Sequence, residues 1–270
     1  MTPLIKINNF YLKREDLNIT GSAKDRAMAS QIQNLKKKGF KKAVISSTGN
    51  AAISAIHFCQ KNNLSLTIFL SPKINQNKLK LIKKSSTNII ITPKPISQAF
   101  KYAKQNNAYF LRQSTDPSAI SGYKKIGKEI MSQLPQITSL FAPVGSGTTL
   151  FAISQSIPDS IKLFAIQPAS HTPIASVFDK NFYKETKSST NSLSAKFLPL
   201  KNKLIKAIKK TKGSGLVIQE KQLQIAKKIL QKQQIFTSAE GYLTLAGFLK
   251  TKNKCQPGDY PVILLTGTNR

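Results

Sequence analysis

The sequence predicts an α/β fold with mostly parallel, twisted sheets. From Ala43 onward, short apolar runs rich in β-forming residues alternate with longer helix-like segments. Several of these runs end in turns rich in Gly, Ser and Thr. The chain has 270 residues, 40% of them hydrophobic, which is enough for one large domain or two small ones. Because no internal repeat or extended linker appears, we expect two interlocked α/β domains.

Eight short apolar runs are expected to be strands, because polar or turn residues bound each of them: 43–46, 66–70, 88–91, 108–111, 139–142, 161–166, 215–218 and 262–265. Three segments have the length and apolar spacing of covering helices: 51–61, 75–84 and 97–104. Residues 178–212, rich in Lys, Ser, Thr and Asn, are expected to form a surface loop with a short helix. We expect a smaller domain of residues 37–122, inserted into a larger domain made of residues 1–36 and 123–270.

The formal net charge of +31 raises the possibility of a nucleic-acid partner held by phosphate contacts. Arginine, the residue that base-reading proteins favour, is rare among the 42 basic residues: Arg14, Arg26, Arg112 and Arg270. The lysines are scattered along the chain, as a compositional bias would place them. Solvated lysine faces therefore explain the charge better than nucleic-acid binding, and attraction of anionic metabolites stays open.

The two cysteines, Cys59 and Cys255, are far apart and lack metal-ligand spacing, so neither a disulfide framework nor a metal site is expected. The N-terminus has no apolar core of a signal peptide, and no apolar run reaches the roughly 18 residues of a membrane span. These observations predict a cytoplasmic protein without a membrane segment. The two histidines, His57 and His171, are expected to have structural or surface roles.

Lys24 lies in the segment Thr20-Gly21-Ser22-Ala23-Lys24-Asp25-Arg26. The residues Thr20-Gly21-Ser22 supply turn and N-cap chemistry, which places Lys24 in the first turn of a helix. The positive end of the helix dipole disfavours the ammonium form of a lysine there. This suits an amine that must form an imine, although the segment taken alone is better explained by an ordinary surface lysine.

Two further turns each follow an expected strand and open an expected helix. In Ser46-Ser47-Thr48-Gly49-Asn50-Ala51-Ala52, hydroxyls and free backbone N–H groups make a pocket for a carboxylate. In Pro143-Val144-Gly145-Ser146-Gly147-Thr148-Thr149, the same chemistry can cradle a phosphate. Each turn alone is weak evidence for a ligand site, but the three segments in this order form a specific set.

Together these segments resemble the fold-type II pyridoxal-phosphate enzymes, the family of threonine synthase, threonine dehydratase and cysteine synthase. The resemblance covers nearly the whole chain. The forms Asn-x-Thr-Gly-Ser-x-Lys-Asp-Arg and Ser-Thr-Gly-Asn look closest to threonine synthases. The resemblance implies pyridoxal 5'-phosphate as cofactor, a small amino acid as substrate and a homodimer.

The resemblance also implies roles for particular residues. Lys24 would carry the cofactor as a Schiff base and act as the catalytic general base, and Asn50 would hydrogen-bond the phenolic oxygen of the cofactor. Thr266, which ends the last expected strand, would contact the pyridine nitrogen. The substrate carboxylate would be held by Ser47, Thr48, Gly49 and Asn50. The cofactor phosphate would be bound by Gly145, Ser146, Gly147, Thr148 and Thr149. The segment Ala239–Gly247 resembles a family helix start behind the cofactor, although a plain helix start fits it as well.

The chain departs from the threonine synthase pattern where that pattern contacts the substrate phosphate. The pattern Asn-Pro-x-Arg-Ile-Glu-Gly-Gln-Lys-Thr here begins with Asp116 and has Ala119 at the arginine. Both changes weaken a phosphate site, for which Arg112 or Lys124 would have to compensate. We therefore expect a threonine synthase-like lyase with weak activity and an elevated Michaelis constant, both of which Ala119→Arg would improve. A serine/threonine dehydratase is the alternative, and a lysine-rich nucleic-acid-binding protein is the alternative outside enzymes.

Overall fold

The computed structural model describes residues 1–47, 49–72, 74, 76–83, 85, 87–251 and 258–268. The chain divides into two compact units. Unit 1 comprises Met1–Ala23 and Tyr123–Arg270, and unit 2 comprises Lys24–Gly122. Each unit has its own sheet and its own hydrophobic core.

Unit 1 is built on a six-stranded sheet in the order β1-β2-β10-β7-β8-β9. Only β1 runs antiparallel to its neighbour, and all other pairs are parallel. The strands are β1 (Leu4–Ile7), β2 (Phe10–Arg14), β7 (Ser139–Pro143), β8 (Lys162–Pro168), β9 (Ser214–Ile218) and β10 (Pro261–Leu265). Because β7 and β10 are buried at every position, they read in the sequence as continuous apolar runs.

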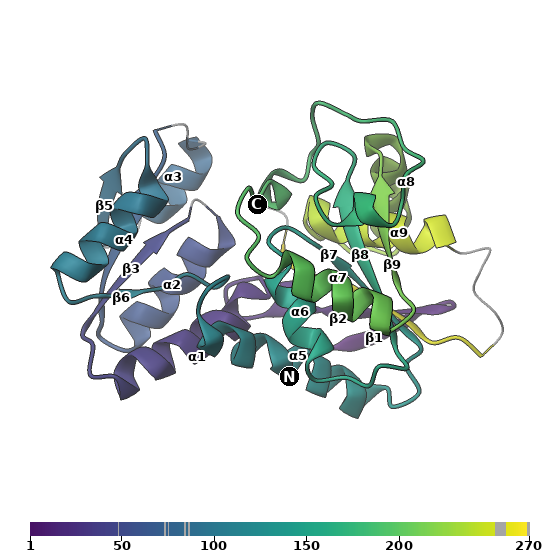
Figure 1. Cartoon of the computed structure of the whole chain (residues 1–270), viewed down its shortest axis with the longest axis horizontal. Coiled ribbons are helices and arrows are strands. Elements are labelled where there is room, and N and C mark those ends of the chain that lie inside the picture. Colours follow the sequence, from purple (N-terminus) through teal and green to yellow (C-terminus); the bar gives the residue numbers. More distant parts are fainter. Residues whose placement is uncertain are drawn as a thin grey trace. The chain divides into compact units, whose positions relative to one another are not determined.

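The helices of unit 1 cover both faces of this sheet: α6 (Thr148–Ser154), α7 (Lys201–Lys210), α8 (Glu220–Lys232) and α9 (Ala239–Thr251). Figure 1 shows α7 on the near side of the sheet and α9 on the far side. In the sheet, the ring of Phe141 stacks on the ring of Phe164, with 4.4 Å between the ring centroids. The same ring meets the ring of Phe248 in α9 edge-on, with 5.5 Å between the centroids. Short 3₁₀ turns lie at Glu15–Leu17, Ala175–Val177 and Asn191–Leu193.

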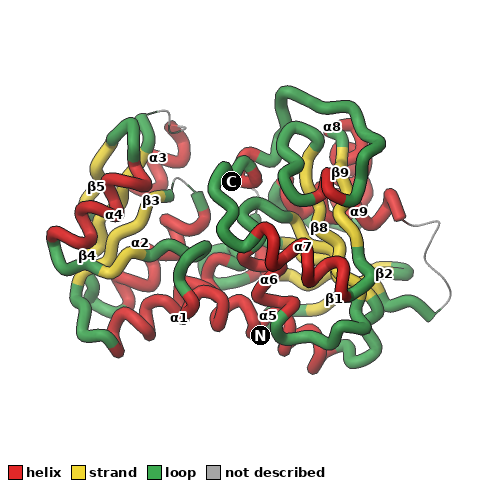
Figure 2. Tube along the Cα trace, viewed as in Figure 1, coloured by secondary structure: helices red, strands yellow, loops and turns green. Residues whose placement is uncertain are grey.

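Unit 2 has a four-stranded parallel sheet in the order β5-β4-β3-β6, and Figure 2 shows its helices on both sides of the strands. The strands are β3 (Lys42–Ser46), β4 (Ser65–Leu70), β5 (Asn88–Ile91) and β6 (Tyr109–Phe110). The helices are α1 (Lys24–Lys37), α2 (Asn50–Lys61), α3 (Gln76–Lys83) and α4 (Pro95–Gln105). Helix α5 (Pro117–Gln133) begins in unit 2 and continues into unit 1.

The predicted fold class is confirmed, and each of the eight expected strands and three expected helices has a counterpart within a few residues of its expected ends. The pair β1 and β2 was not predicted. Its sequence hides the strand pattern because β2 buries a charged residue, Lys13, with none of its surface exposed. The expected surface segment 178–212 contains α7 as its helix, which buries Leu204 and Ile208 on one side.

The domain boundaries expected from the sequence place residues 24–36 with the larger domain, whereas these residues group with unit 2. The difference arises because α1 packs along α2. The division into functional domains stays a prediction. Within the described ranges, no helix is long and apolar enough to cross a membrane.

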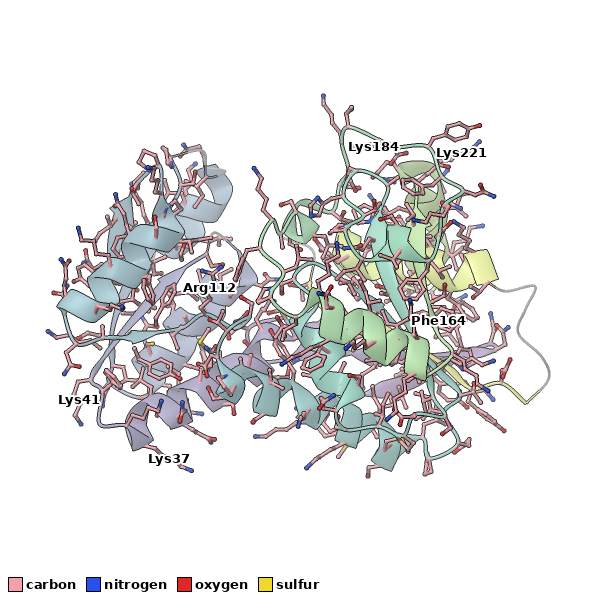
Figure 3. The ribbon with its side chains drawn as sticks, in the orientation of Figure 1. Lys37, Lys41, Arg112, Phe164, Lys184 and Lys221 are labelled. Carbon is pink, nitrogen blue, oxygen red and sulfur yellow. The ribbon has the colours of Figure 1, made fainter. Side chains whose placement is uncertain are left out.

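The lysines that Figure 3 labels point outward: Lys37 and Lys41 from unit 2, Lys184 and Lys221 from unit 1. All four are exposed. These four lysines are therefore solvated.

Candidate functional site

The sequence motifs of unit 1 gather at one edge of its sheet. Strands β2, β10, β7, β8 and β9 are parallel, so their carboxyl ends meet at the same edge. Three candidate segments lie immediately after these strands: residues 15–23 after β2, residues 144–149 after β7 and Thr266 after β10. Ligands of open parallel sheets bind outside the carboxyl ends of the strands, so this is the edge at which a ligand is expected.

The turn after β7 has the geometry of an anion-binding loop. Gly147 adopts a φ of +86°, a left-handed conformation that glycine tolerates best. A Cβ atom added to it would lie 2.9 Å from Cδ2 of Leu204. The first hydrogen bond of α6 runs from the N–H of Phe151 to the carbonyl of Gly147 at 2.9 Å. The amides that precede Phe151 are not used by the helix, so they can bind an anion. All the predicted phosphate residues lie in this turn or in the first turn of α6: Gly145, Ser146, Gly147, Thr148 and Thr149.

Thr266 joins the end of β10 to the segment that leads to Lys24. Its carbonyl accepts the N–H of Ala23 at 3.0 Å, and the N–H of Thr268 donates to the carbonyl of Gly21 at 2.9 Å. The backbone directly before Lys24 is therefore fixed to the backbone directly after β10. The side chain of Thr266 is half-buried.

A third segment joins the same place through Gly267. Its carbonyl accepts the N–H of Ser238 at 2.7 Å and the hydroxyl of Thr237 at 2.9 Å. On its other side, Gly267 pairs with Ser22 in an antiparallel bridge. The start of α9, the end of β10 and the turn before α1 are thus connected by hydrogen bonds.

The sequence did not point to Ser22 and Ser238, whose hydroxyls are a notable feature of this edge. Both side chains are buried, with exposed fractions of 0% and 8%, and neither hydroxyl has a hydrogen-bond partner among the described residues. The N-cap role expected from the Thr20-Gly21-Ser22 turn is therefore wrong for Ser22, whose hydroxyl makes no capping bond.

Lys24 is the first residue of α1, as expected, and is half-buried. The next residue, Asp25, is buried and accepts a hydrogen bond from the hydroxyl of Ser54 in α2 at 2.6 Å. This buried bond ties the first turn of α1 to α2 within unit 2. The first turn of α1, which carries Lys24, is therefore held by a neighbouring helix.

The carboxylate pocket expected in unit 2 lies at the amino end of α2. Asn50 is the first residue of the helix and Gly49 is its N-cap, whose carbonyl accepts the N–H of Ala52 at 2.9 Å. Ser47 turns back on the loop, where its hydroxyl accepts the N–H of Gly49 at 3.3 Å. Thr48, the remaining residue of this set, lies outside the described residues.

The segment compared with the threonine synthase phosphate site forms a helix start. Asp116 is buried, and one of its carboxylate oxygens accepts the N–H and hydroxyl of Ser118, at 2.9 and 2.6 Å. Its other oxygen accepts Nε2 of Gln31 at 2.8 Å and the hydroxyl of Tyr109 at 2.7 Å. Burial, together with the bond to Asp116, raises the pKa of the Tyr109 hydroxyl.

Ala119 lies in the first turn of α5 with none of its surface exposed. An arginine there would have to enter a packed interior, so the expectation that Ala119→Arg would improve a phosphate site does not fit the structure. The acid at position 116 likewise does not face a ligand anion, because its oxygens are occupied by the helix cap and its neighbours.

A buried ion pair anchors β2, the strand that leads to the candidate edge. The ammonium group of Lys13 donates to the carbonyl of Thr2 at 2.8 Å, to Glu129 at 2.8 Å and to Gln133 at 2.9 Å. Such a pair is costly to break because one charge would stay buried.

Both histidines contact neighbouring residues: the ring of His57 meets the ring of Phe58 edge-on, and Nε2 of His171 lies 2.9 Å from the carbonyl of Ala195.

A family model described as pyridoxal-phosphate dependent enzyme matches residues 1–267. The chain belongs to this family of fold-type II enzymes, and pyridoxal phosphate is its cofactor. A catabolic L-threonine dehydratase from Staphylococcus aureus is 26% identical over 99% of this chain and 84% of the relative.

Two solved structures share the fold. Maize serine racemase matches with a TM-score of 0.86 at 18% identity, over 100% of this chain and 88% of that one. Threonine deaminase isoform 2 from Solanum lycopersicum matches with a TM-score of 0.78 at 20% identity, over 97% and 75%. None of these three proteins is named a threonine synthase, so the expected closeness to that enzyme has no support from them.

The residues of unit 1 fit the cofactor. The turn 144–149 offers backbone amides and hydroxyls to a phosphate, and a side chain at Gly147, whose Cβ would lie 2.9 Å from Leu204, would disturb this turn. The hydroxyl of Thr266 is a neutral partner suited to a ring nitrogen, and the buried hydroxyls of Ser22 and Ser238 leave hydrogen-bonding capacity at the same edge.

Proposed function

We propose that this chain is a serine/threonine dehydratase, which converts a small β-hydroxy amino acid to a 2-oxo acid and ammonia. The observation that carries the choice of reaction is the helix start at Asp116 and Ala119. The threonine synthase resemblance would draw substrate-phosphate contacts from this segment, but Ala119 is buried and the Asp116 carboxylate is engaged by Gln31, Tyr109 and Ser118. A substrate without a phosphate needs no such contact. The likeness to a threonine dehydratase along nearly the whole chain supports the same choice.

The proposal assigns the cofactor to residues of the three motifs. Lys24 would hold it covalently through its amine, and Asn50 would donate to its phenolic oxygen. Thr266 would be the partner of its ring nitrogen. The phosphate is held by Gly145, Ser146, Gly147, Thr148 and Thr149, whose turn precedes the first bond of α6.

The substrate is held by its carboxylate at the amino end of α2. The N–H groups of the first helical turn have no partner inside the helix, and the dipole of α2 favours an anion there. Ser47, Thr48, Gly49 and Asn50 are assigned to this role. Holding the carboxylate fixes the α-carbon and so directs its hydrogen toward one acceptor.

Lys24 moves the proton. The ε-amine of Lys24 would be the general base that takes the proton from the α-carbon of the bound substrate. When bound, pyridoxal phosphate withdraws electrons from the α-carbon and so makes this proton easier to remove. Loss of the β-hydroxyl as water leaves an enamine, which water then hydrolyses to the 2-oxo acid and ammonia. A neutral partner such as the hydroxyl of Thr266 would leave the ring nitrogen largely unprotonated, which would favour elimination over transamination.

A threonine synthase is the second candidate, because the forms Ser47-Thr48-Gly49-Asn50 and Thr20-Gly21-Ser22 resemble that enzyme. The two reactions differ in their leaving group. A dehydratase releases 2-oxo acid and ammonia from serine or threonine, whereas a threonine synthase releases inorganic phosphate from O-phosphohomoserine.

The test is a substrate panel with purified, cofactor-loaded protein. L-serine, L-threonine and O-phosphohomoserine are supplied separately, and 2-oxo acid, phosphate and threonine are measured in each sample. We expect 2-oxo acid from serine or threonine, and its loss in Lys24→Ala. Phosphate and threonine from O-phosphohomoserine, without 2-oxo acid from the hydroxy amino acids, would replace the dehydratase by the second candidate. The cytoplasmic location and the homodimer stay predictions.

A further inference from the structure

Two buried serine hydroxyls of unit 1 make no hydrogen bond among the described residues: Oγ of Ser22 and Oγ of Ser238. Their side chains are 0% and 8% exposed. Buried polar groups in folded proteins are almost always paired, because a buried hydroxyl without a partner destabilises the fold. Each of these hydroxyls therefore requires an explanation.

Both serines lie against the same short segment, although they are more than 200 residues apart in the sequence. Ser22 pairs with Gly267 in an antiparallel bridge. The N–H of Ser238 donates to the carbonyl of Gly267 at 2.7 Å. The two residues thus flank the chain that follows β10, directly after Thr266.

The backbone contacts explain why these segments meet, but they do not explain the hydroxyls. Alanine would make the same backbone bonds at both positions, would occupy nearly the same volume and would leave no unpaired oxygen. By contrast, the neighbouring Thr237 uses its hydroxyl, which donates to the carbonyl of Gly267 at 2.9 Å. The hydroxyls of Ser22 and Ser238 therefore have unused hydrogen-bonding capacity beside the residue that follows Thr266.

We propose that the hydroxyls of Ser22 and Ser238 are cofactor-binding groups, which join Thr266 in holding the polar atoms of the pyridoxal ring. All three are neutral donors and acceptors, so they bind the ring without fixing a charge beside it. The inference rests on the placement of the cofactor at the carboxyl edge of the unit 1 sheet. It does not depend on which amino acid the enzyme processes.

The test compares stability without cofactor to affinity for the cofactor, in the full-length chain. The variants are Ser22→Ala, Ser238→Ala and the double variant. Ser139→Ala is the matched control, because Ser139 is also 8% exposed but lies at the first residue of β7, the opposite edge of the sheet. Urea unfolding of the apo-protein gives stability, and titration with pyridoxal phosphate, followed by absorbance, gives the dissociation constant.

We expect each single variant to bind the cofactor about two- to tenfold more weakly, the range of one ordinary hydrogen bond. The apo-protein should keep or gain stability, because an unpaired buried hydroxyl is removed. The position of the absorbance maximum should shift in at least one variant, and Ser139→Ala should change neither affinity nor absorbance.

Wild-type affinity in both Ser22→Ala and Ser238→Ala would overturn the proposal. So would a loss of apo-protein stability equal to the loss of affinity, since the hydroxyls would then serve the fold. Gly147→Ala, run beside them, separates this failure from a wrong cofactor placement. If Gly147→Ala also leaves affinity unchanged, the placement itself is wrong and the inference falls with it.

Discussion

Arginine at position 119 is the change that the threonine synthase resemblance recommends, and the structure predicts that it is damaging. The pattern of that enzyme has an arginine where this chain has Ala119. If the segment faced a substrate phosphate, Ala119→Arg would supply a missing contact and lower the Michaelis constant for O-phosphohomoserine. Ala119, however, is completely buried in the first turn of α5.

The cost follows from burial. Extra atoms in a packed interior cost about 1 to 3 kcal/mol, because neighbouring side chains must leave their preferred rotamers. A buried charge without a partner costs about 3 to 5 kcal/mol. Some relief by movement of the long side chain toward solvent is expected, so we predict a loss of about 3 to 5 kcal/mol in the free energy of unfolding. Since domains are stable by about 5 to 15 kcal/mol, this change would remove a large part of the total.

Equilibrium unfolding in urea measures this loss, and Ser121→Arg is the matched control. Ser121 lies on the same helix, two residues further on, and is exposed. We expect Ser121→Arg to stay within about 0.5 kcal/mol of the wild type, as exposed substitutions do. If Ala119→Arg instead keeps its stability and gains phosphate release from O-phosphohomoserine, position 119 faces a ligand and the argument for a dehydratase fails.

Three other predictions test the site and the core. Lys24→Ala should abolish the visible absorbance of bound cofactor and keep the far-ultraviolet circular dichroism; a band that survives, with borohydride labelling another lysine, contradicts the assignment. Gly147→Ala should weaken cofactor binding by about tenfold. A side chain at its left-handed φ of +86° costs about 1 to 2 kcal/mol and would place its Cβ 2.9 Å from Leu204, so the turn would relax away from the shape that presents its amides. Gly145→Ala, whose added Cβ meets its nearest neighbour at 3.5 Å, should change the dissociation constant much less, and equal effects would argue against the turn geometry. In a Cys255→Ser variant, Cys59 should resist alkylation at pH 8 until urea unfolds the protein, since burial raises the pKa of its thiol to about 12; rapid labelling of the folded protein would refute this.

Much of the fold could be predicted because parallel strands are buried on both faces. Buried strands such as β7 and β10 appear as short, continuous apolar runs, and turn residues mark their ends. The turn after β7 was recognisable for a related reason: glycine and hydroxyl residues between a strand and a helix have few other uses. By contrast, β2 was not predicted, because it contains the charged residue Lys13. Lys13 is buried all the same, since its ammonium group donates hydrogen bonds to Thr2, Glu129 and Gln133.

The sequence by itself determined the α/β class, the family motifs at Lys24, Asn50 and Gly147, and the cofactor that they imply. These features depend on residues that are close together in the chain. Only the tertiary structure decided which side chains are buried and which hydrogen bonds they make. Ser22 and Ser238 meet at Gly267 through bonds between distant segments, and no local pattern records such a meeting. In the same way, Asp116 read as an added charge at a ligand site until Gln31, 85 positions away, and Tyr109 were found on its oxygens. The reason is physical: burial and pairing are set by neighbours in space, whereas a sequence shows only neighbours along the chain.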